Sequence, residues 1–274
     1  MSSLVGPRLK RRGLVAVLAT GFLVSTSIDS SANADPAASS SGAHRVGSGT
    51  SASSSAIVPF SLIFQDDFNG SVLNPNAWCV FNGPGKARGP KSASNVFVSN
   101  GAMVLRAQKI NGEWYGAGVC NTRAVVQTYG KYTMRVRFGA GKGVRTSGLL
   151  WPYGGGWPPE VDFYEIEGRD PQRTNLMLTN HYRDAFGRHM QHGFIKGNYT
   201  QWHIVGVEWR PTSLTFKIDG VVVKTMTGHV PQQSMWFGMN VALGTGANAP
   251  DSTTPAHVDA QVDWIRIFKY NGAG

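Results

Sequence analysis

Four carboxylates fall within eight residues of the stretch GWPPEVDFYEIEG, residues 156–168: Glu160, Asp162, Glu165 and Glu167. Like charges along one strand repel each other and destabilise a sheet, so folding alone does not explain the row. Paired carboxylates can cleave a glycosidic bond, one as nucleophile and the other as proton donor. A solvated edge strand or a calcium site are the other interpretations, since carboxylate oxygens also bind hard cations. We favour a catalytic cluster, because a calcium cage needs ligands from several directions.

The spacing of these acids requires an irregular strand. In a regular strand Glu160 and Asp162 share one face, and Glu165 falls on the opposite, apolar face. Burying its carboxylate there would cost free energy. One extra residue at Phe163 or Tyr164, in the form of a β-bulge, returns all four acids to one face. The sequence therefore predicts a bulge between Asp162 and Glu165.

The chain beyond this stretch alternates polar and apolar residues as β-strands do. KYTMRVRF has apolar side chains at every second position, and no stretch of a dozen residues has clean helical spacing. LTFKIDGVVVKTM and VFVSNGAMVLRA each contain a dipeptide that favours tight hairpins, Asp219-Gly220 and Asn100-Gly101. The pattern predicts an all-β domain over residues 58–271, an antiparallel β-sandwich or jelly roll with a concave substrate cleft.

The N-terminal residues have the composition of an export signal. Basic residues precede an apolar run from Gly13 to about Ser25, and small residues at 32–34 suit cleavage. The run is shorter than the roughly 20 residues that span a bilayer. We therefore expect a signal peptide at 1–34, secretion, and no membrane association after cleavage. Residues 35–57 form a Ser/Ala/Gly tract that we expect to be a disordered linker.

The charge of the chain says little about a charged partner. The formal net charge is +10, but no run of Lys or Arg follows the first 34 residues, so we expect no nucleic-acid partner. Solubility explains the excess more simply than attraction to an acidic wall polymer does.

The two cysteines, Cys79 and Cys120, offer one possible cross-link. In an oxidising compartment they could pair and close a loop worth about 4 kcal/mol in the chain-entropy model. Two separate buried thiols are the alternative. Zinc is a poor fit, because a site of two thiols has no neighbouring histidine to complete it.

The stretch from Glu160 to Glu165 resembles the E-x-D-x-x-E pattern of glycoside hydrolase family 16, jelly-roll enzymes that include laminarinases, licheninases and enzymes that cleave agar or carrageenan. The resemblance extends over nearly all of residues 60–270, through FQDDFNGSVLNPNAW, TYGKYTMRVRF, WHIVGVEWRPTSLTFKIDG and VDWIRIFKY. It implies Glu160 as nucleophile, Asp162 as the residue that assists it, and Glu165 as acid/base. The two residues between Asp162 and Glu165 resemble the bulged, laminarinase-like branch.

Side-chain chemistry and the same resemblance suggest further residues of the site. Trp151 and Trp157 could stack on sugar rings, although packing in the core or in loops is as good an explanation. His181 resembles a histidine beside the catalytic strand, with a hydrogen-bonded core histidine as the alternative. Asn240 matches a position near the cleft and could equally be structural. Asp263 matches a ligand of a structural calcium on the convex side, and the resemblance implies no required cofactor.

These residues together predict a secreted, monomeric, retaining endo-β-glycanase whose partner is a polysaccharide. β-1,3-Glucan or β-1,3-1,4-glucan is the leading substrate, from the resemblance. The alternatives are a transglycosylase on the same polysaccharides, a hydrolase of galactans such as agar or carrageenan, and a non-catalytic, lectin-like module. Glu167 is a rival acid that Arg169 or Arg173 could neutralise. Four arginines near the expected cleft could meet the anionic groups of a galactan: Arg145, Arg169, Arg183 and Arg188.

Overall fold

The computed structural model describes residues 59–85 and 89–272, and the predicted signal peptide and linker lie outside them. Within the described residues the domain consists of two antiparallel sheets and two short 3-10 turns, η1 (Ala93–Asn95) and η2 (Gly246–Asn248). No helix in this part of the chain has the length and apolar character to cross a membrane. The all-β sandwich expected from the sequence is confirmed.

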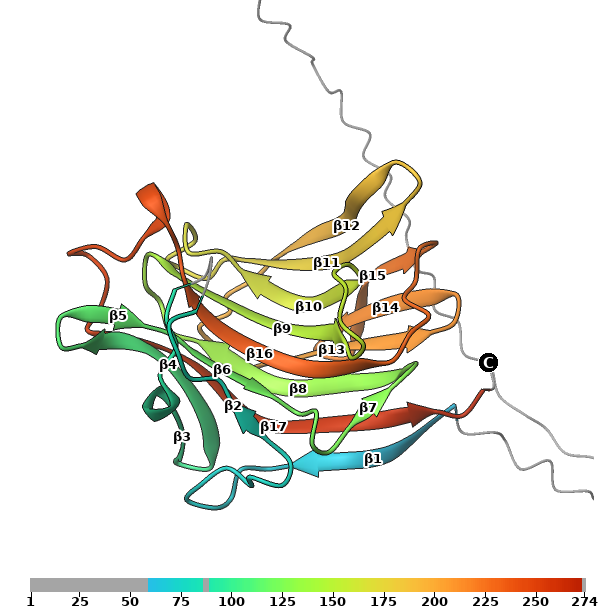
Figure 1. Ribbon diagram of the computed structural model, residues 1–274, viewed down its shortest axis with the longest axis horizontal. Coiled ribbons are helices and arrows are strands. Elements are labelled where there is room, and N and C mark those ends of the chain that lie inside the picture. The colour runs from blue at the N-terminus through green and yellow to red at the C-terminus, as the bar shows by residue number, and fades with distance from the viewer. Residues whose placement is uncertain (1–58, 86–88, 273–274) are drawn as a thin grey trace, which may run out of the picture. The chain divides into compact units, whose positions relative to one another are not determined.

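The first sheet has eight described strands, which form one broad surface. In spatial order they are β12 (Gly187–Lys196), β11 (Asn175–Asp184), β10 (Glu160–Ile166), β9 (Val144–Pro152), β16 (Met235–Leu243), β6 (Ala117–Cys120) and β2 (Cys79–Val80), with β7 (Val126–Gln127) paired to β16. Its strands bend so that the outer face is concave (Figure 1). We call this surface the concave face.

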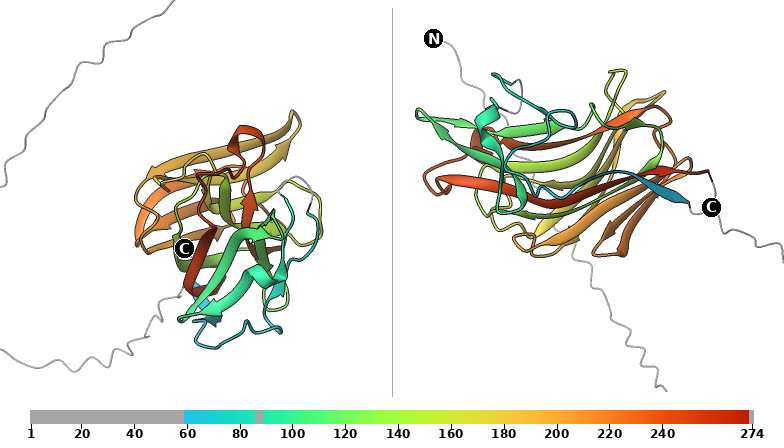
Figure 2. Two further views of the ribbon diagram at one scale, coloured as in Figure 1. Left: turned by 90° about the vertical axis from the view of Figure 1, so that its left-hand side faces the viewer. Right: turned by 90° about the horizontal axis from the view of Figure 1, so that it is seen from below.

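The second sheet has nine described strands and lies against the inner side of the first (Figures 1 and 2). In spatial order they are β15 (Val221–Thr227), β14 (Ser213–Ile218), β13 (His203–Arg210), β8 (Gly130–Phe138), β17 (His257–Tyr270), β4 (Ala102–Ile110) and β3 (Val96–Ser99), with β1 (Phe60–Asp66) paired to β17 and β5 (Glu113–Tyr115) to β4. Its outer side is the convex face of the domain.

The alternation read from the sequence matches the observed burial. In β8 the apolar positions are buried and the polar positions between them are partly or fully exposed. Both predicted hairpin turns are present, and all four of their central residues have positive φ: Asn100, Gly101, Asp219 and Gly220. Because Asn and Gly tolerate this conformation best, the turn residues fix where these hairpins reverse.

The core lies between the two sheets and is rich in aromatic side chains. Tyr164 of β10 contacts Phe138 of β8, with ring centroids 4.9 Å apart, and Phe163 contacts Phe237 of β16 at 5.8 Å. These contacts tie the acidic strand both to the opposite sheet and to its own. Phe163 and Tyr164 are both fully buried in the core.

Candidate active site

The acidic strand β10 contains the predicted bulge. On one side, Asp162 and Glu165 lie opposite Thr179 and Met177 of β11, so three steps along β10 match two along β11. On the other side the register with β9 also shifts between Asp162 and Tyr164. The extra residue is Phe163, which turns into the core. The prediction of a bulge at this point is confirmed.

The bulge places the three predicted catalytic acids on one face. Glu160 and Asp162 pair with β11 residues two apart, and Asp162 and Glu165 do so again once the bulge is counted. All three carboxylic side chains project away from the core, yet the residues are only 6%, 2% and 5% exposed, respectively. The carboxylates therefore lie in a surface that neighbouring side chains shield from water.

The register of the strands arranges the concave face in three rows that run across the sheet. The rows are Phe194, Met177, Glu165, Ser147, Asn240 and Gly118; then His192, Thr179, Asp162, Leu149, Gly238 and Cys120; then Met190, His181 and Glu160, continued by the pair Trp151 and Trp236. The first two rows cross six strands, and at a spacing of about 4.8 Å each of them is about 24 Å long. That length accommodates several sugar rings of a polymer.

Glu160 is held by the tryptophan three residues before it. The indole Nε1 of Trp157 donates a hydrogen bond to Oε2 of Glu160 at 2.5 Å. The Trp157 ring also lies 5.5 Å from the His181 ring and has the guanidinium of Arg188 5.1 Å from its centroid. Trp157 therefore orients a carboxylate as well as facing the concave side, a role the sequence did not indicate.

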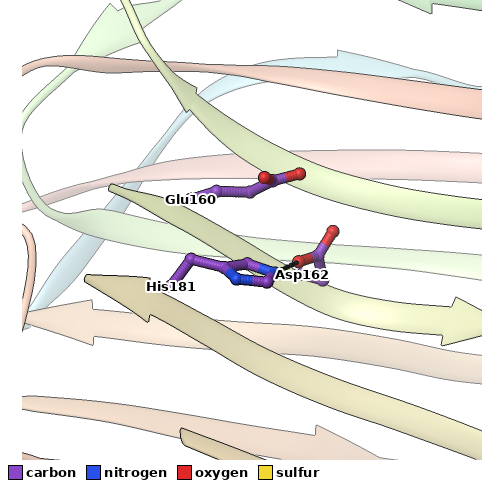
Figure 3. A group of neighbouring side chains, drawn as sticks. All are labelled: Glu160, Asp162 and His181. Atoms are coloured by element: carbon purple, nitrogen blue, oxygen red, sulfur yellow. Dashed lines mark ion pairs between the residues drawn. The ribbon is translucent and has the colours of Figure 1, made fainter. Parts of the chain in front are cut away.

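Asp162 lies close to a histidine of the neighbouring strand. Its Oδ2 is 3.4 Å from Nε2 of His181, and Glu160 lies directly across the ladder from His181 (Figure 3). One ligand atom from each of Glu160, Asp162 and His181 lies within 4.8 Å of the others. The structure thus brings His181 to the acids, as the sequence predicted, and its chemical role stays a prediction.

Glu165 is linked to the rival acid by an arginine. Nη2 of Arg145 on β9 donates to Oε1 of Glu165 at 2.6 Å and to Oε1 of Glu167 at 2.8 Å. We had assigned the neutralisation of Glu167 to Arg169 or Arg173, and the structure assigns it to Arg145. Arg173 is instead buried, where its guanidinium donates to four backbone carbonyls. Burial lowers the pKa of Arg173 to about 10.

A cavity of about 320 Å³ adjoins Glu165 on the concave face. Its lining includes Glu167 and Asn175 as polar groups, and Met177 and Phe194 as an apolar side. Phe194 is 53% exposed, although it is large and apolar. An exposed aromatic side chain beside a carboxylate suits the apolar face of a sugar. The sequence analysis missed Phe194, although the alternation of GRHMQHGFIK could have placed it on the same face as Met190 and His192.

The remaining predicted residues are distributed as follows. Trp151 is partly exposed and pairs with Trp236, and Asn240 is partly exposed and shares a row with Glu165. Both therefore lie on the concave face. Asp263 lies on β17 in the other sheet, where Arg135 forms an ion pair with it at 2.6 Å. A guanidinium so close to the carboxylate disfavours a calcium ion at this side chain, and calcium binding stays a prediction.

A disulfide joins Cys79 and Cys120, whose Cα atoms are 5.1 Å apart. The two residues lie opposite each other on β2 and β6, and Cys120 lies opposite Gly238 of β16. By register the disulfide therefore lies at the end of the row that contains Asp162, on the concave side of the sheet.

A β-sandwich with shielded, hydrogen-bonded carboxylates along one strand of an open concave face is the arrangement of a glycoside hydrolase. The sequence comparison gives the same class. The family model of the glycosyl hydrolases family 16 matches residues 86–266. The chain belongs to this family.

The relatives of the chain include several named glucanases. It is 26% identical over 191 residues to the endo-1,3-1,4-beta-glycanase ExsH of Rhizobium meliloti (strain 1021), covering 65% of this chain and 41% of the relative. It is 28% identical over 221 residues to a beta-glucanase of Bacillus subtilis (strain 168), covering 75% and 86%. The chain thus spans less than half of ExsH and most of the Bacillus enzyme.

Solved structures share the fold. The laminarinase from Rhodothermus marinus is 22% identical with a TM-score of 0.67, covering 77% of this chain and 98% of that structure. The endo-beta-1,3-glucanase from Pyrococcus furiosus is also 22% identical with a TM-score of 0.67, covering 78% and 96%. At this level of identity the likeness is evidence for the jelly roll alone.

Proposed function

We propose that the protein is a retaining endo-β-glycanase whose nucleophile is Glu160 and whose acid/base is Glu165. The observation that carries this proposal is the bulge at Phe163, because it puts both glutamates on the concave face. Asp162, between them in sequence and beside His181, assists the nucleophile.

The reaction follows from these roles in two displacements. The carboxylate of Glu160 attacks the anomeric carbon while Glu165 gives its proton to the glycosidic oxygen, so one bond forms as the other breaks. A glycosyl ester on Glu160 results. Water then attacks the same carbon, Glu165 takes the proton from that water, and Glu160 leaves as a carboxylate. Two inversions give net retention of the anomeric configuration.

We propose β-1,3-glucan or mixed β-1,3-1,4-glucan as the substrate. Relatives named endo-1,3-1,4-beta-glycanase and beta-glucanase support this choice. A row of about 24 Å across six strands suits attack within a long chain. A sulfated galactan is a weaker candidate, because the guanidinium of Arg145 is engaged by two carboxylates and that of Arg188 lies over Trp157.

The proposal includes export and a monomeric state. Export rests on the basic and apolar composition of the first 34 residues. The disulfide between Cys79 and Cys120 agrees with an oxidising compartment. No step of the proposed reaction calls for a cofactor.

The test is a digestion panel of laminarin, lichenan, curdlan, agarose and carrageenan with sizing of the products. We expect intermediate-length oligosaccharides from at least one of the β-glucans, with the β anomer as the first product by NMR. An α anomer would indicate an inverting reaction. Degradation of agarose or carrageenan alone would contradict the substrate class.

Azide rescue separates the two glutamates, using an aryl glycoside whose leaving group needs no proton. With Glu160→Ala, azide enters from the face that the nucleophile has left and gives the α-glycosyl azide. With Glu165→Ala, azide attacks the glycosyl ester on Glu160 and gives the β-glycosyl azide. Glu113→Ala, at an exposed glutamate of β5, is the control and should keep parental activity. Parental hydrolytic activity in either Glu160→Ala or Glu165→Ala would overturn the assignment of nucleophile and acid/base.

A further inference from the structure

The convex face carries an aromatic and polar row that the cleavage reaction does not use. Arg137 of β8 lies opposite Gln261 of β17, and Val136 lies opposite His203 of β13. Trp202 directly precedes His203 and therefore lies beside Arg137. The row runs from Trp202, directly before β13, to Arg137 of β8 and Gln261 of β17 in the nine-stranded sheet, whose outer side is seen from below in Figure 2 (right).

Cationic side chains support the indole of Trp202. The guanidinium carbons of Arg135 and Arg137 each lie 4.7 Å from the centroid of its ring. Arg137 in turn donates from Nε to Oε1 of Gln261 at 2.5 Å. These contacts fix the orientation of an indole that remains partly exposed. Trp202 therefore orients Arg137, which continues the row to Gln261.

A polar cavity of about 280 Å³ adjoins Arg137 and Gln261 of this row, and Trp202 contacts its lining through Arg137. Arg137, Thr200, His257, Asp259 and Gln261 contribute polar side chains to its lining. The volume equals that of about nine liquid waters, which is close to what a single hexose ring occupies. The cavity lies in a different sheet from β10, so its residues take no part in the row of catalytic acids.

The chemistry of the lining favours sugar hydroxyl groups over an anion. Arg137 and Thr200 offer donors, while Gln261 and Asp259 offer acceptors. Arg106 donates two hydrogen bonds of 2.8 Å to Asp259, so the negative charge of this carboxylate is compensated while its side chain still lines the cavity. A phosphate or sulfate would meet that carboxylate, whereas a hydroxyl group can donate to it. A pyranose carries several hydroxyl groups that both donate and accept, so it can satisfy both kinds of partner.

We propose that the cavity beside Trp202 is a second carbohydrate-binding site that holds a neutral glucan segment on the convex face. The identity of the polymer rests on the proposed function, whereas the site itself rests on its lining. A chain held here and in the cleft at once is bound at two points. Such two-point binding raises the effective concentration of polymer at the catalytic acids.

Affinity electrophoresis of the full chain tests this site, with Glu160→Ala as the background so that the polymer is not cut. In gels containing soluble laminarin or lichenan, Trp202→Ala should lower the apparent affinity about 3- to 10-fold. Arg137→Ala should lower it in the same direction, which keeps the test informative if the tryptophan variant folds poorly. The matched control is Trp264→Ala, at a tryptophan that is stacked with Arg266, a residue outside the cavity lining, and it should migrate as the background does.

Kinetics with the active enzyme give an independent reading. Trp202→Ala should raise KM for the polymer and leave kcat unchanged, and kcat/KM for a short aryl glycoside that fills only the cleft should not change. Unaltered mobility of both Trp202→Ala and Arg137→Ala in every gel would overturn the site, as would an equal loss in Trp264→Ala. If the parent cleaves no β-glucan but its retardation still depends on Trp202, the proposed function fails and the site stands. If the parent cleaves a β-glucan but its retardation does not depend on Trp202 or Arg137, the site is rejected and the proposed function stands.

Discussion

Replacing Arg145 by Met should lower the catalytic rate because it removes a positive charge, while it keeps most of the packing of the aliphatic part of the side chain. In the parent, Nη2 of Arg145 contacts one oxygen of Glu165 and one of Glu167. Both carboxylates are within hydrogen-bond distance of the same nitrogen, so their oxygens are separated by roughly 5 Å. Without the guanidinium, two negative charges at this distance face each other directly whenever Glu165 is ionised, which is the state that takes the proton from water in the second displacement.

The size of that repulsion follows from Coulomb's law. Two unit charges about 5 Å apart at an effective dielectric constant of about 20 repel by about 3 kcal/mol. The side chains of Arg145 and Glu167 are 24% and 29% exposed, so solvent reduces this to about 1–2 kcal/mol. If Glu165 shifts from its productive position in response, kcat/KM for the cleaved glucan should fall about 10- to 30-fold.

A double-mutant cycle isolates this effect. Glu167→Gln alone removes the second charge and leaves Arg145 on Glu165, so it should change kcat/KM little. The double variant Arg145→Met/Glu167→Gln should recover most of the loss, giving a coupling free energy of about 1–2 kcal/mol. A coupling below about 0.5 kcal/mol would refute the reasoning, because Arg145 would then act on Glu165 independently of Glu167. Thermal unfolding of all three variants shows whether a loss of activity reflects a loss of fold.

Three further predictions concern the strand and its surroundings. Gly148→Ala should destabilise the domain by about 1–3 kcal/mol, because its Cβ would lie 2.2 Å from the Tyr164 ring. The control Gly154→Ala has no atom within 4 Å of its Cβ and should unfold at the same midpoint as the parent. Equal unfolding midpoints for the two variants would contradict this packing. The disulfide between Cys79 and Cys120 closes a loop of 41 residues, so its reduction should lower the free energy of unfolding by about 4 kcal/mol. A thermal midpoint that does not respond to reductant would exclude the cross-link. Burial raises the pKa of Tyr164 well above its usual range; because the folded value exceeds the unfolded one, the stabilisation is complete below about pH 10 and is lost as the pH rises further. Tyr164→Phe should therefore flatten the alkaline loss of stability in denaturant titrations, and an unchanged slope would be evidence against this burial.

The sequence was sufficient to predict features that depend on local order along the chain. Alternation located β8, the Asn100-Gly101 and Asp219-Gly220 pairs located two turns, and the parity of the acids located the bulge. Each of these rests on spacing within a few residues, which the chain displays directly.

The contacts that the sequence could not show are those made across strands. The pairing of Arg145 with Glu165 and Glu167 depends on the register between β9 and β10, which nothing local in either strand specifies. The nearer arginines in sequence seemed the natural partners for Glu167, but Arg173 satisfies backbone carbonyls in the interior instead. Proximity along the chain is a weak guide to ion pairs in a sheet, because strands bring distant residues together.

The bulge connects the stability of the fold with the geometry of the site. Without the extra residue, a regular strand would send one acid toward the core; with it, Phe163 and Tyr164 both enter the core and the acids stay outside. These two rings pack against Phe237 and Phe138, from β16 and β8, and so anchor β10 at two points behind the carboxylates. The aromatic contacts that contribute to folding are thus also the contacts that set the direction of Glu165. The strand that carries the acids is therefore fixed from the opposite side by the core.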